Sequence, residues 1–167
     1  MIANQNFKAA LRPYLPADAP MLAAIFRASI EDLTGEDYDE DQRNAWAAAG
    51  ADEQAFGRKL ADLLTLVATI DGAPCGFAAL KSNDRIEMLY VYPAVAGQGI
   101  GTLLVDALEK LGQARGAKSV SVDASDTARA LFERRGYKAQ SRNSVPLSGE
   151  WLANTTLEKR FDAATKP

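Results

Sequence analysis

The sequence lacks histidine altogether. Histidine is the side chain that most often serves as a general base or metal ligand near neutral pH, so its absence excludes serine–histidine and cysteine–histidine catalysis and every histidine-ligated metal site. The single cysteine, Cys75, cannot form an internal disulfide, and we interpret it as a small buried side chain rather than a reactive thiol. We therefore expect no metal, and an acid or base must be a carboxylate, tyrosine, lysine, cysteine or water.

An excess of positive charge is also missing. The chain has 19 lysines and arginines against 22 aspartates and glutamates, a net charge of −3, and a pI near 5.1. Nucleic-acid-binding proteins normally show a basic excess, so we expect no nucleic-acid partner. Residues 88–105 carry no charge, but Pro93 and several glycines interrupt them, which favours strand, loop and helix over a membrane span. Without a secretory signal in residues 1–13, the expected location is the cytoplasm.

The length of 167 residues, with 47% hydrophobic and 25% charged residues, predicts one globular domain over residues 1–167. A strand is predicted near residues 7–12. The helix after it is expected to be capped by Asp18 and to end at Gly35, because the apolar residues between them follow helical spacing. Two more helices are predicted near residues 39–49 and 52–63, separated by Gly50.

The second half of the chain alternates strands and helices. Asp71-Gly72 is a strong turn signal and predicts a hairpin of residues 64–70 and 74–80. A strand over 85–92 is followed by a glycine-rich loop and an amphipathic helix from Ile100, closed by Gly112 or Gly116. A strand over 118–124, a short helix over 126–135 stopped by Gly136, and strands over 137–145 and 151–161 complete the order. This order predicts a mixed α/β fold with parallel pairing near the middle of its sheet.

Three alternate glycines, Gly97, Gly99 and Gly101, lie between the predicted strand and helix. Glycines let several backbone N–H groups point toward one anion, and a helix N-terminus adds partial positive charge, a combination that suits a pyrophosphate. The spacing is neither that of a P-loop nor that of a dinucleotide-binding loop. A tight turn with close packing is the alternative interpretation of the same glycines.

Two separated segments of the chain carry a further signal. The first comprises Leu89-Tyr90-Val91-Tyr92-Pro93 with Gly99-Ile100-Gly101, and the second is the Ala128 to Tyr137 segment with Phe132-Glu133 and Gly136. In this order the two segments resemble the GNAT superfamily of N-acetyltransferases. The resemblance spans nearly the whole chain. It implies a mixed sheet of about seven strands, flanked by helices and splayed between its fourth and fifth strands, with acetyl-CoA as cosubstrate in the gap.

The resemblance also implies which residues contact acetyl-CoA. The pyrophosphate would lie on the amides of the glycine loop and helix start, and the pantetheine would pair with the strand backbone before the loop. The implied contacts are Leu89, Tyr90, Val91, Gly97, Gln98, Gly99, Ile100, Gly101, Thr102, Ser125 and Phe132.

Three positions depart from the family pattern. Ala96 stands where Arg or Gln is usual, which removes one charge-assisted bond to phosphate, worth about 1.5 to 3 kcal/mol. A basic residue among Arg129, Arg134 and Arg135 would compensate, unless these simply form a solvated helix face. Ser125 replaces an asparagine and can contact pantetheine or cap the next helix. Phe132 falls where the family often has a tyrosine that protonates the leaving thiolate.

Acetyl transfer requires a neutral amine, so a carboxylate is expected to remove its proton, directly or through water. Glu87, two residues before Leu89, is the candidate base, because the resemblance places an acidic residue there in many members; a polar residue on a wet strand face is the alternative. A backbone N–H near Leu89 or Tyr90 would polarise the thioester carbonyl. Ser125 with water can assist the leaving thiolate, and a base elsewhere, such as Asp32, stays open.

Residues 31–41 contain seven carboxylates and no lysine or arginine, in the segment that borders the acceptor pocket of the family. They can attract a cationic amine or form an ordinary solvated face. Asp32, Tyr38 and Trp46 are the candidate acceptor contacts, with Trp151 as a further aromatic; core packing is the alternative for both tryptophans. We expect acetylation of a small, cationic amine in a ternary complex. A noncatalytic acyl-CoA-binding domain and a protein N-acetyltransferase are the alternatives, and a homodimer is left open.

Overall fold

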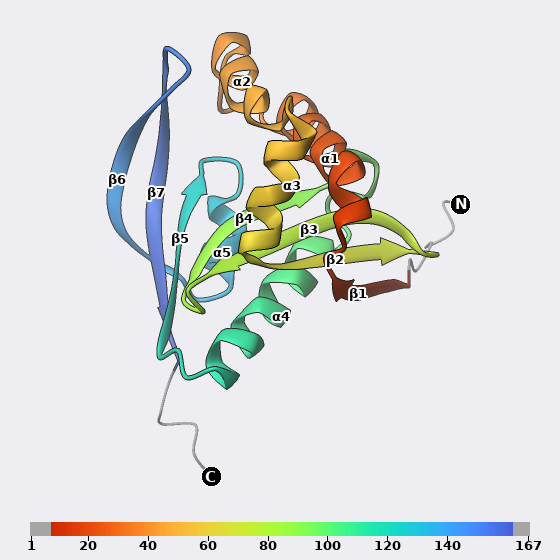
Figure 1. Ribbon diagram of the computed structural model, residues 1–167. Helices are drawn as coiled ribbons and strands as arrows, with labels where there is room; N and C mark the ends of the chain where they lie inside the picture. Colours follow the sequence, from red (N-terminus) through yellow and green to blue (C-terminus); the bar gives the residue numbers. More distant parts are fainter. Residues whose placement is uncertain (1–7, 162–167) are drawn as a thin grey trace, which may run out of the picture.

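The computed structural model describes residues 8–161, which form a seven-stranded sheet in the order β1-β2-β3-β4-β5-β7-β6 (Figure 1). Neighbouring strands are antiparallel except β4 and β5, which are parallel. The predicted mixed α/β fold and its number of strands are confirmed. The strands are β1 Ala9–Pro13, β2 Leu64–Ile70, β3 Ala73–Lys81, β4 Arg85–Val91, β5 Ser119–Ser125, β6 Lys138–Leu147 and β7 Glu150–Arg160.

Helices cover both faces of the sheet (Figure 1). On one face α1 and α3 pack over β2, β3 and β4, and on the opposite face α4 packs over the same strands. No helix among residues 8–161 is both long and apolar enough to cross a membrane. The helices are α1 Ala19–Leu33, α2 Glu40–Ala47, α3 Glu53–Asp62, α4 Ile100–Ala114 and α5 Arg129–Arg134, with 3-10 turns at Pro16–Asp18, Ala48–Gly50 and Pro93–Val95.

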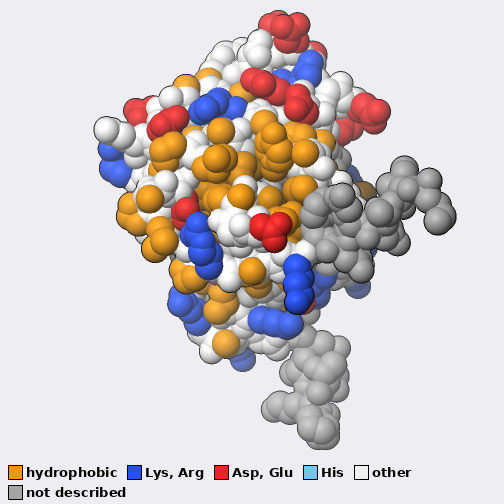
Figure 2. Space-filling model, turned by 90° about the vertical axis from the view of Figure 1, so that its right-hand side faces the viewer, with side chains coloured by type: hydrophobic (Ala, Val, Ile, Leu, Met, Phe, Trp, Pro, Cys, Tyr) orange, Lys and Arg blue, Asp and Glu red, His pale blue; other side chains and the backbone are white. Residues whose placement is uncertain are grey.

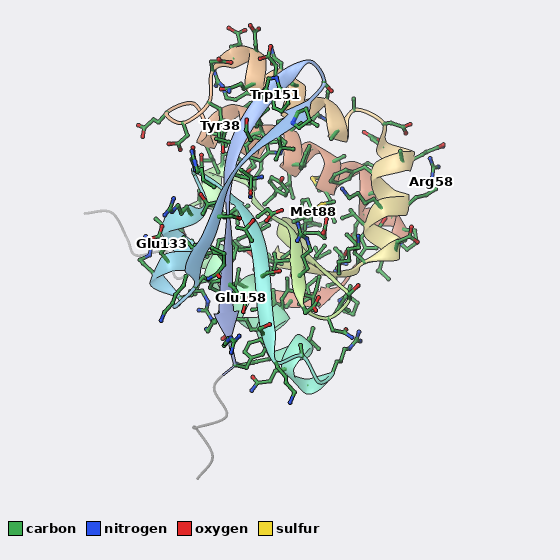
Figure 3. All side chains as sticks on the ribbon, turned by 90° about the vertical axis from the view of Figure 1, so that its left-hand side faces the viewer. Tyr38, Arg58, Met88, Glu133, Trp151 and Glu158 are labelled. Carbon is green, nitrogen blue, oxygen red and sulfur yellow. The ribbon has the colours of Figure 1, made fainter. Side chains whose placement is uncertain are left out.

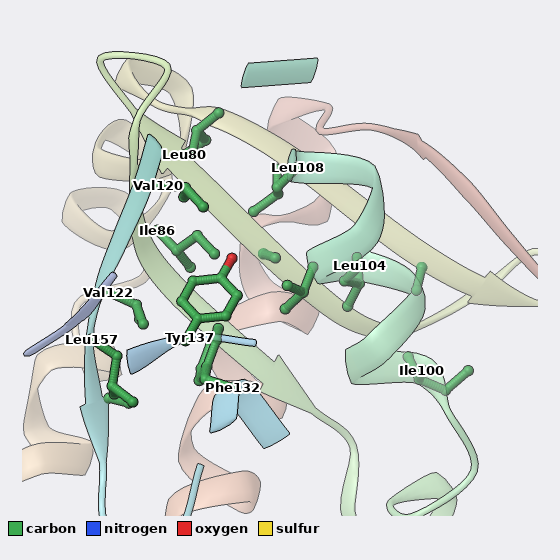
Figure 4. Close-up of a cluster of buried hydrophobic side chains, with 14 of the residues drawn as sticks. Leu80, Ile86, Ile100, Leu104, Leu108, Val120, Val122, Phe132, Tyr137 and Leu157 are labelled. Carbon is green, nitrogen blue, oxygen red and sulfur yellow. The ribbon is translucent and has the colours of Figure 1, made fainter. Parts of the chain in front are cut away.

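Each face of the sheet has its own hydrophobic core. Phe26 of α1 and Phe77 of β3 belong to the core beneath α1 and α3. Leu104 and Leu108 of α4 pack with Phe132 in the core on the other face (Figure 4). All five of these side chains are buried, because the apolar stripes of the helices meet apolar positions of the strands.

Several predicted element ends are confirmed by side-chain contacts. The carboxylate of Asp39 accepts a hydrogen bond from Gln42 N at 2.8 Å, and Asp52 accepts one from Ala55 N at 3.0 Å, so these aspartates cap α2 and α3. Asp71 and Gly72 have φ of 51° and 82°, as the predicted hairpin turn requires.

The predicted cap of α1 is wrong, although Asp18 does precede the helix. Its backbone is already helical, and its carboxylate binds the Arg12 guanidinium at 2.7 and 2.8 Å and accepts Leu15 N at 2.8 Å. A strong ion pair with β1 therefore replaces the helix cap. The other end of α1 is closed by Thr34 rather than Gly35, because the Thr34 hydroxyl donates to Ile30 O at 2.5 Å.

Of the two glycines predicted to close α4, Gly116 does so: it follows the C-cap residue Arg115 with φ +96°. Gly112 instead lies inside α4, where a Cβ would come within 2.4 Å of Asn83 O. The short helix α5 begins at Arg129 rather than 126, because residues 125–128 form a turn. Phe7, the first residue of the first predicted strand, lies outside the described residues.

Strand β4 contains a bulge at Glu87. Ala79 of β3 pairs with Met88, and the next residue, Leu80, pairs with Ile86, so Glu87 is an extra residue in β4. The bulge changes the alternation of the strand: Ile86 and Leu89 both pack in the core beneath α4, whereas Met88 packs in the core beneath α1. Glu87 is thereby placed at the point where β4 leaves β5.

Candidate functional site

The sheet opens between β4 and β5. These strands pair only at Arg85 with Ser121 and at Ile86 with Val122, whereas β4 pairs with β3 as far as Val91. Within the described residues, the edge of β4 that faces β5 therefore has no strand partner over residues 87–91. Backbone groups on such an edge take their hydrogen bonds from water or from a ligand.

A cavity of about 640 Å³ lies at this opening. Its walls come from α1, α2, β4, β5, the start of α4 and the segment around α5, so residues distant in the sequence meet there. The volume falls in the range of small-molecule sites. Among the lining side chains, those with polar or aromatic groups of interest are Ser29, Thr34, Trp46, Glu87, Tyr90, Asp123, Ser125, Phe132 and Arg134.

The glycine loop forms one end of the cavity. Gly97 and Gly99 have φ of +78° and +87°, and a Cβ built on either would meet no atom within 4 Å, so their backbone faces open space. The helix α4 begins at Ile100, its first-turn N–H groups lack helical acceptors, and its first three residues line the cavity. Gly101 differs, because a Cβ there would lie 3.1 Å from Leu131 Cδ1. Two glycines thus leave room for an anion, and the third allows close packing.

Three comparisons identify the family. The acetyltransferase (GNAT) domain model matches residues 34–159. The uncharacterized N-acetyltransferase YafP of Escherichia coli is 33% identical over 144 residues, which cover 86% of this chain and 91% of that protein. This chain belongs to the GNAT family. A GCN5-related N-acetyltransferase structure from Rhodopseudomonas palustris is 57% identical, with a TM-score of 0.90, and the match covers 91% of this chain and 95% of that one.

A more distant GNAT structure shows the same fold. The PaiA N-acetyltransferase of Thermoplasma acidophilum, solved in complex with coenzyme A, has a TM-score of 0.77 at 17% identity, with 92% of this chain and 99% of that chain covered. The expected family, the splayed sheet and the N-acetyltransferase activity are confirmed. Acetyl-CoA is accordingly the cosubstrate of this chain.

The cavity suits an extended phosphorylated cosubstrate. At one end the open glycine loop and the α4 N-terminus favour negative charge, and along one wall the free edge of β4 offers backbone donors and acceptors. Of the cofactor contacts predicted from the sequence, the structure brings the following ten to the cavity, and leaves Gln98 exposed outside it: Leu89, Tyr90, Val91, Gly97, Gly99, Ile100, Gly101, Thr102, Ser125 and Phe132.

Ser125 and Phe132 stand on the β5 and α5 side of the cavity. The Ser125 hydroxyl accepts a hydrogen bond from Ala128 N at 3.1 Å, so it caps the turn that leads to α5. Phe132 is 1% exposed and packs edge-on against Tyr137, with ring centroids 5.1 Å apart (Figure 4). The Tyr137 hydroxyl donates to Glu109 at 2.9 Å and does not line the cavity.

Glu87 lies in the cavity wall and is held by Arg85. Its Oε1 accepts a hydrogen bond from Arg85 Nε at 2.9 Å, and Arg85 Nη2 also binds Asp123 Oδ2 at 2.5 Å. Asp123, on β5, accepts a further hydrogen bond from Thr156 at 2.6 Å. The guanidinium therefore joins a carboxylate of β4 to one of β5 at the mouth of the opening.

Sequence reasoning missed Asp123, although β5 contains the signal for it. Val120, Val122 and Ala124 alternate with polar residues and pack in the core beneath α4. Asp123 therefore lies on the opposite face, which it shares with Ser125, the cavity residue that was predicted.

The aromatic candidates have different positions. Trp46 lines the cavity, and its Nε1 donates to the Tyr90 hydroxyl at 3.2 Å. Burial raises the pKa of Tyr90 to about 12, so this hydroxyl stays protonated at neutral pH. Tyr38 is 5% exposed and does not line the cavity; its hydroxyl donates to Ala153 O at 2.6 Å and accepts Asp126 N at 2.9 Å.

Trp151 lies away from the cavity. It is 62% exposed near the tip of the β6–β7 hairpin, and Figure 3 shows it far along the hairpin from Glu158. Its backbone carbonyl accepts a hydrogen bond from Gln42 Nε2 at 2.8 Å, which ties α2 to the hairpin. The structure thus brings Trp46 to the cavity but not Trp151.

None of the seven carboxylates in residues 31–41 lines the cavity. Asp32 is exposed, Asp37 accepts a hydrogen bond from Thr127 at 2.7 Å, and Asp39 caps α2. Figure 2 shows acidic side chains gathered toward the end of the molecule where α2 lies in Figure 1. These charges therefore lie outside the cavity, whereas Glu87 and Asp123 are the carboxylates that line it.

The three arginines considered as substitutes for the Arg or Gln that the family usually has at position 96 differ in their contacts. Arg129 pairs with Glu133 at 2.5 Å, and Arg135 pairs with Asp106 at 3.2 Å and with Glu109. Arg134 lines the cavity and forms no salt bridge with any residue of the described range.

Proposed function

We propose that this GNAT enzyme acetylates the amine of a small, cationic acceptor by direct attack within a ternary complex, with Glu87 as the general base. The proposal treats residues 1–167 as one catalytic domain. Its main support is the position of Glu87, which stands at the bulge where β4 leaves β5, in the wall of the cavity and beside the free strand edge.

The reaction assigns a role to each group. The neutral amine nitrogen attacks the thioester carbonyl carbon, the new C–N bond forms, and the C–S bond breaks. The amine proton passes to the Glu87 carboxylate, directly or through water, and a backbone N–H near Leu89 or Tyr90 stabilises the developing oxyanion. A thiol with a pKa of about 8.5 leaves as thiolate at pH 7 at a cost of about 2 kcal/mol, so Phe132 in place of an acid is tolerable.

Two features of the cavity support a cationic acceptor. Glu87 and Asp123 of the cavity wall share the guanidinium of Arg85, so this cluster of three side chains keeps a net negative charge, and Trp46 offers an aromatic surface to a cation. At about 640 Å³ the cavity suits a small molecule together with part of the cosubstrate. For the cosubstrate phosphates we propose that Arg134 supplies the charge that Ala96 lacks.

The test measures CoA release with four acceptors: an alkyl diamine, a neutral aromatic amine, an amino acid with an acidic side chain, and a short peptide. We expect the diamine to react fastest. Glu87→Gln should lower kcat/KM for it by about 10² to 10⁴ while acetyl-CoA affinity stays unchanged. Glu133→Gln is the matched control, because Glu133 also pairs with an arginine but lies outside the cavity.

The outcomes separate the alternatives. Near-normal activity of Glu87→Gln at every pH from 6 to 9 would show that the base lies elsewhere. Preference for the peptide would favour a protein N-acetyltransferase, and CoA binding with no turnover of any of the four acceptors would contradict a small cationic amine as the acceptor.

A further inference from the structure

The base candidate is part of a hydrogen-bonded chain that crosses the opening of the sheet. Arg85 Nε donates to Glu87 at 2.9 Å and its Nη2 binds Asp123 at 2.5 Å. Thr156 of β7 donates to Asp123 at 2.6 Å, and Asn143 of β6 donates to Thr156 at 2.8 Å. The chain therefore runs from the β6–β7 hairpin, through β5, to the carboxylate in the cavity wall.

The position of this chain is set by the topology. Backbone pairing between β4 and β5 ends at Ile86, so Glu87 is the first residue of β4 without a neighbour on that side among the described residues. A bulged residue at a free edge has little to fix its side chain, because no cross-strand neighbour packs beside it. The two-pronged guanidinium supplies that restraint, and its planar fork suits two carboxylates at once.

We propose that Arg85 is a positioning residue for the acetyl transfer: anchored by Asp123 and Thr156, it holds the Glu87 carboxylate toward the acceptor amine. This inference rests on the proposed function, since it assigns a purpose to the orientation of Glu87. A carboxylate misplaced by about 1 Å can cost a factor of about 10² in rate, so the restraint matters for catalysis without touching the acetyl group.

The experiment is a double-mutant cycle. Arg85→Gln should lower kcat for the diamine by about tenfold to a hundredfold, with KM for both substrates nearly unchanged. In a Glu87→Gln background the same change should alter kcat by less than about twofold, because a residue that acts only through Glu87 has nothing left to position. Arg160→Gln is the matched control: Arg160 also pairs with a glutamate two residues away, at 3.6 Å, but is 88% exposed.

Two further variants separate positioning from charge and from folding. Arg85→Lys keeps the charge but not the fork, so we expect it to recover only part of kcat. Asp123→Asn leaves the Arg85 contact with Glu87 in place and removes the charge that anchors it, so kcat should fall in the same direction. Thermal unfolding and acetyl-CoA affinity are measured on each variant, so that a loss of kcat caused by unfolding is identified.

The results distinguish this inference from the function on which it rests. A large loss in Glu87→Gln together with independent, multiplying losses in the double variant would overturn the role of Arg85 and leave the base intact. Full activity of Arg85→Lys would also overturn it, because charge alone would then suffice. Near-normal activity of Glu87→Gln would instead remove the proposed base.

Discussion

The glycine loop allows a sharp test of where the acetyl-CoA phosphates bind. Gly99 caps α4 with φ +87°, and a Cβ there would meet no protein atom within 4 Å. Gly99→Val therefore creates no clash inside the protein, and it has two separable effects. The valine must take the left-handed backbone conformation of Gly99, which costs about 1 to 2 kcal/mol. Its side chain also occupies the space through which a phosphate reaches the loop amides.

Each effect has its own magnitude. The strain should lower the melting temperature by about 2 to 8 °C, at about 2 to 4 °C per kcal/mol for a chain of this size. Loss of a charge-assisted hydrogen bond to phosphate costs about 1.5 to 3 kcal/mol, which weakens acetyl-CoA binding by roughly tenfold to a hundredfold.

The matched control is Gly149→Val in the β6–β7 turn. Gly149 has φ +84°, also has open space around its Cβ position, and does not line the cavity. It should lose similar stability and keep its acetyl-CoA affinity, as measured by calorimetry and thermal unfolding. Equal affinity in the two valine variants would refute the phosphate site at this loop.

Two predictions concern other parts of the molecule. Phe132→Tyr should raise kcat by no more than about thirtyfold, because thiolate departure costs only about 2 kcal/mol at pH 7. A larger rise in a stopped-flow thiol assay would mean that protonation of the leaving group limits the wild-type enzyme by more than this cost. The Arg12 hydrogen bonds hold the pKa of Asp18 below its usual value. This pair therefore stabilises the folded state fully at pH values above the pKa of the unfolded chain, about 3.9, and the stabilisation is lost as the pH falls through the lower pKa of the folded state. Asp18→Asn should lower the unfolding free energy at pH 7 by about 1.5 to 3 kcal/mol, and in denaturant titrations a difference that persisted undiminished in strong acid would exclude the ion pair as its source.

Much of the fold could be predicted because its elements obey local rules. The Asp71-Gly72 turn fixed the β2–β3 hairpin, and the aspartates at 39 and 52 marked the starts of α2 and α3. Asp18 shows where local rules fail. Its type and position suit a helix cap, but Arg12, six residues earlier in the chain, offers a stronger partner that only the tertiary structure brings near.

The site was predictable to the extent that short motifs carry it. The last residues of β4 and the glycine loop that follows them lie together at the cavity because they are close in the sequence. Tyr38 and Trp46 follow one helical spacing in the sequence, so their roles could not be distinguished from it. Only the structure shows that Tyr38 is hydrogen-bonded to β7, whereas Trp46 lines the cavity. The Arg85 bridge joins residues 38 positions apart, so no pattern along the chain indicates it.

The extra residue in β4 has a consequence for how this sequence can change over evolutionary time. Removing Glu87 itself would restore regular pairing and keep Ile86 and Leu89 on the α4 side, but it would delete the carboxylate from the cavity wall. Because the strand period is two, losing any other residue of β4, or gaining one, would turn part of its apolar side chains to the opposite face. Loops such as the β6–β7 turn can gain or lose residues cheaply, but β4 cannot change its length by one. Relatives of this protein that vary in size should therefore keep the spacing from Ile86 to the glycine loop and place their insertions elsewhere.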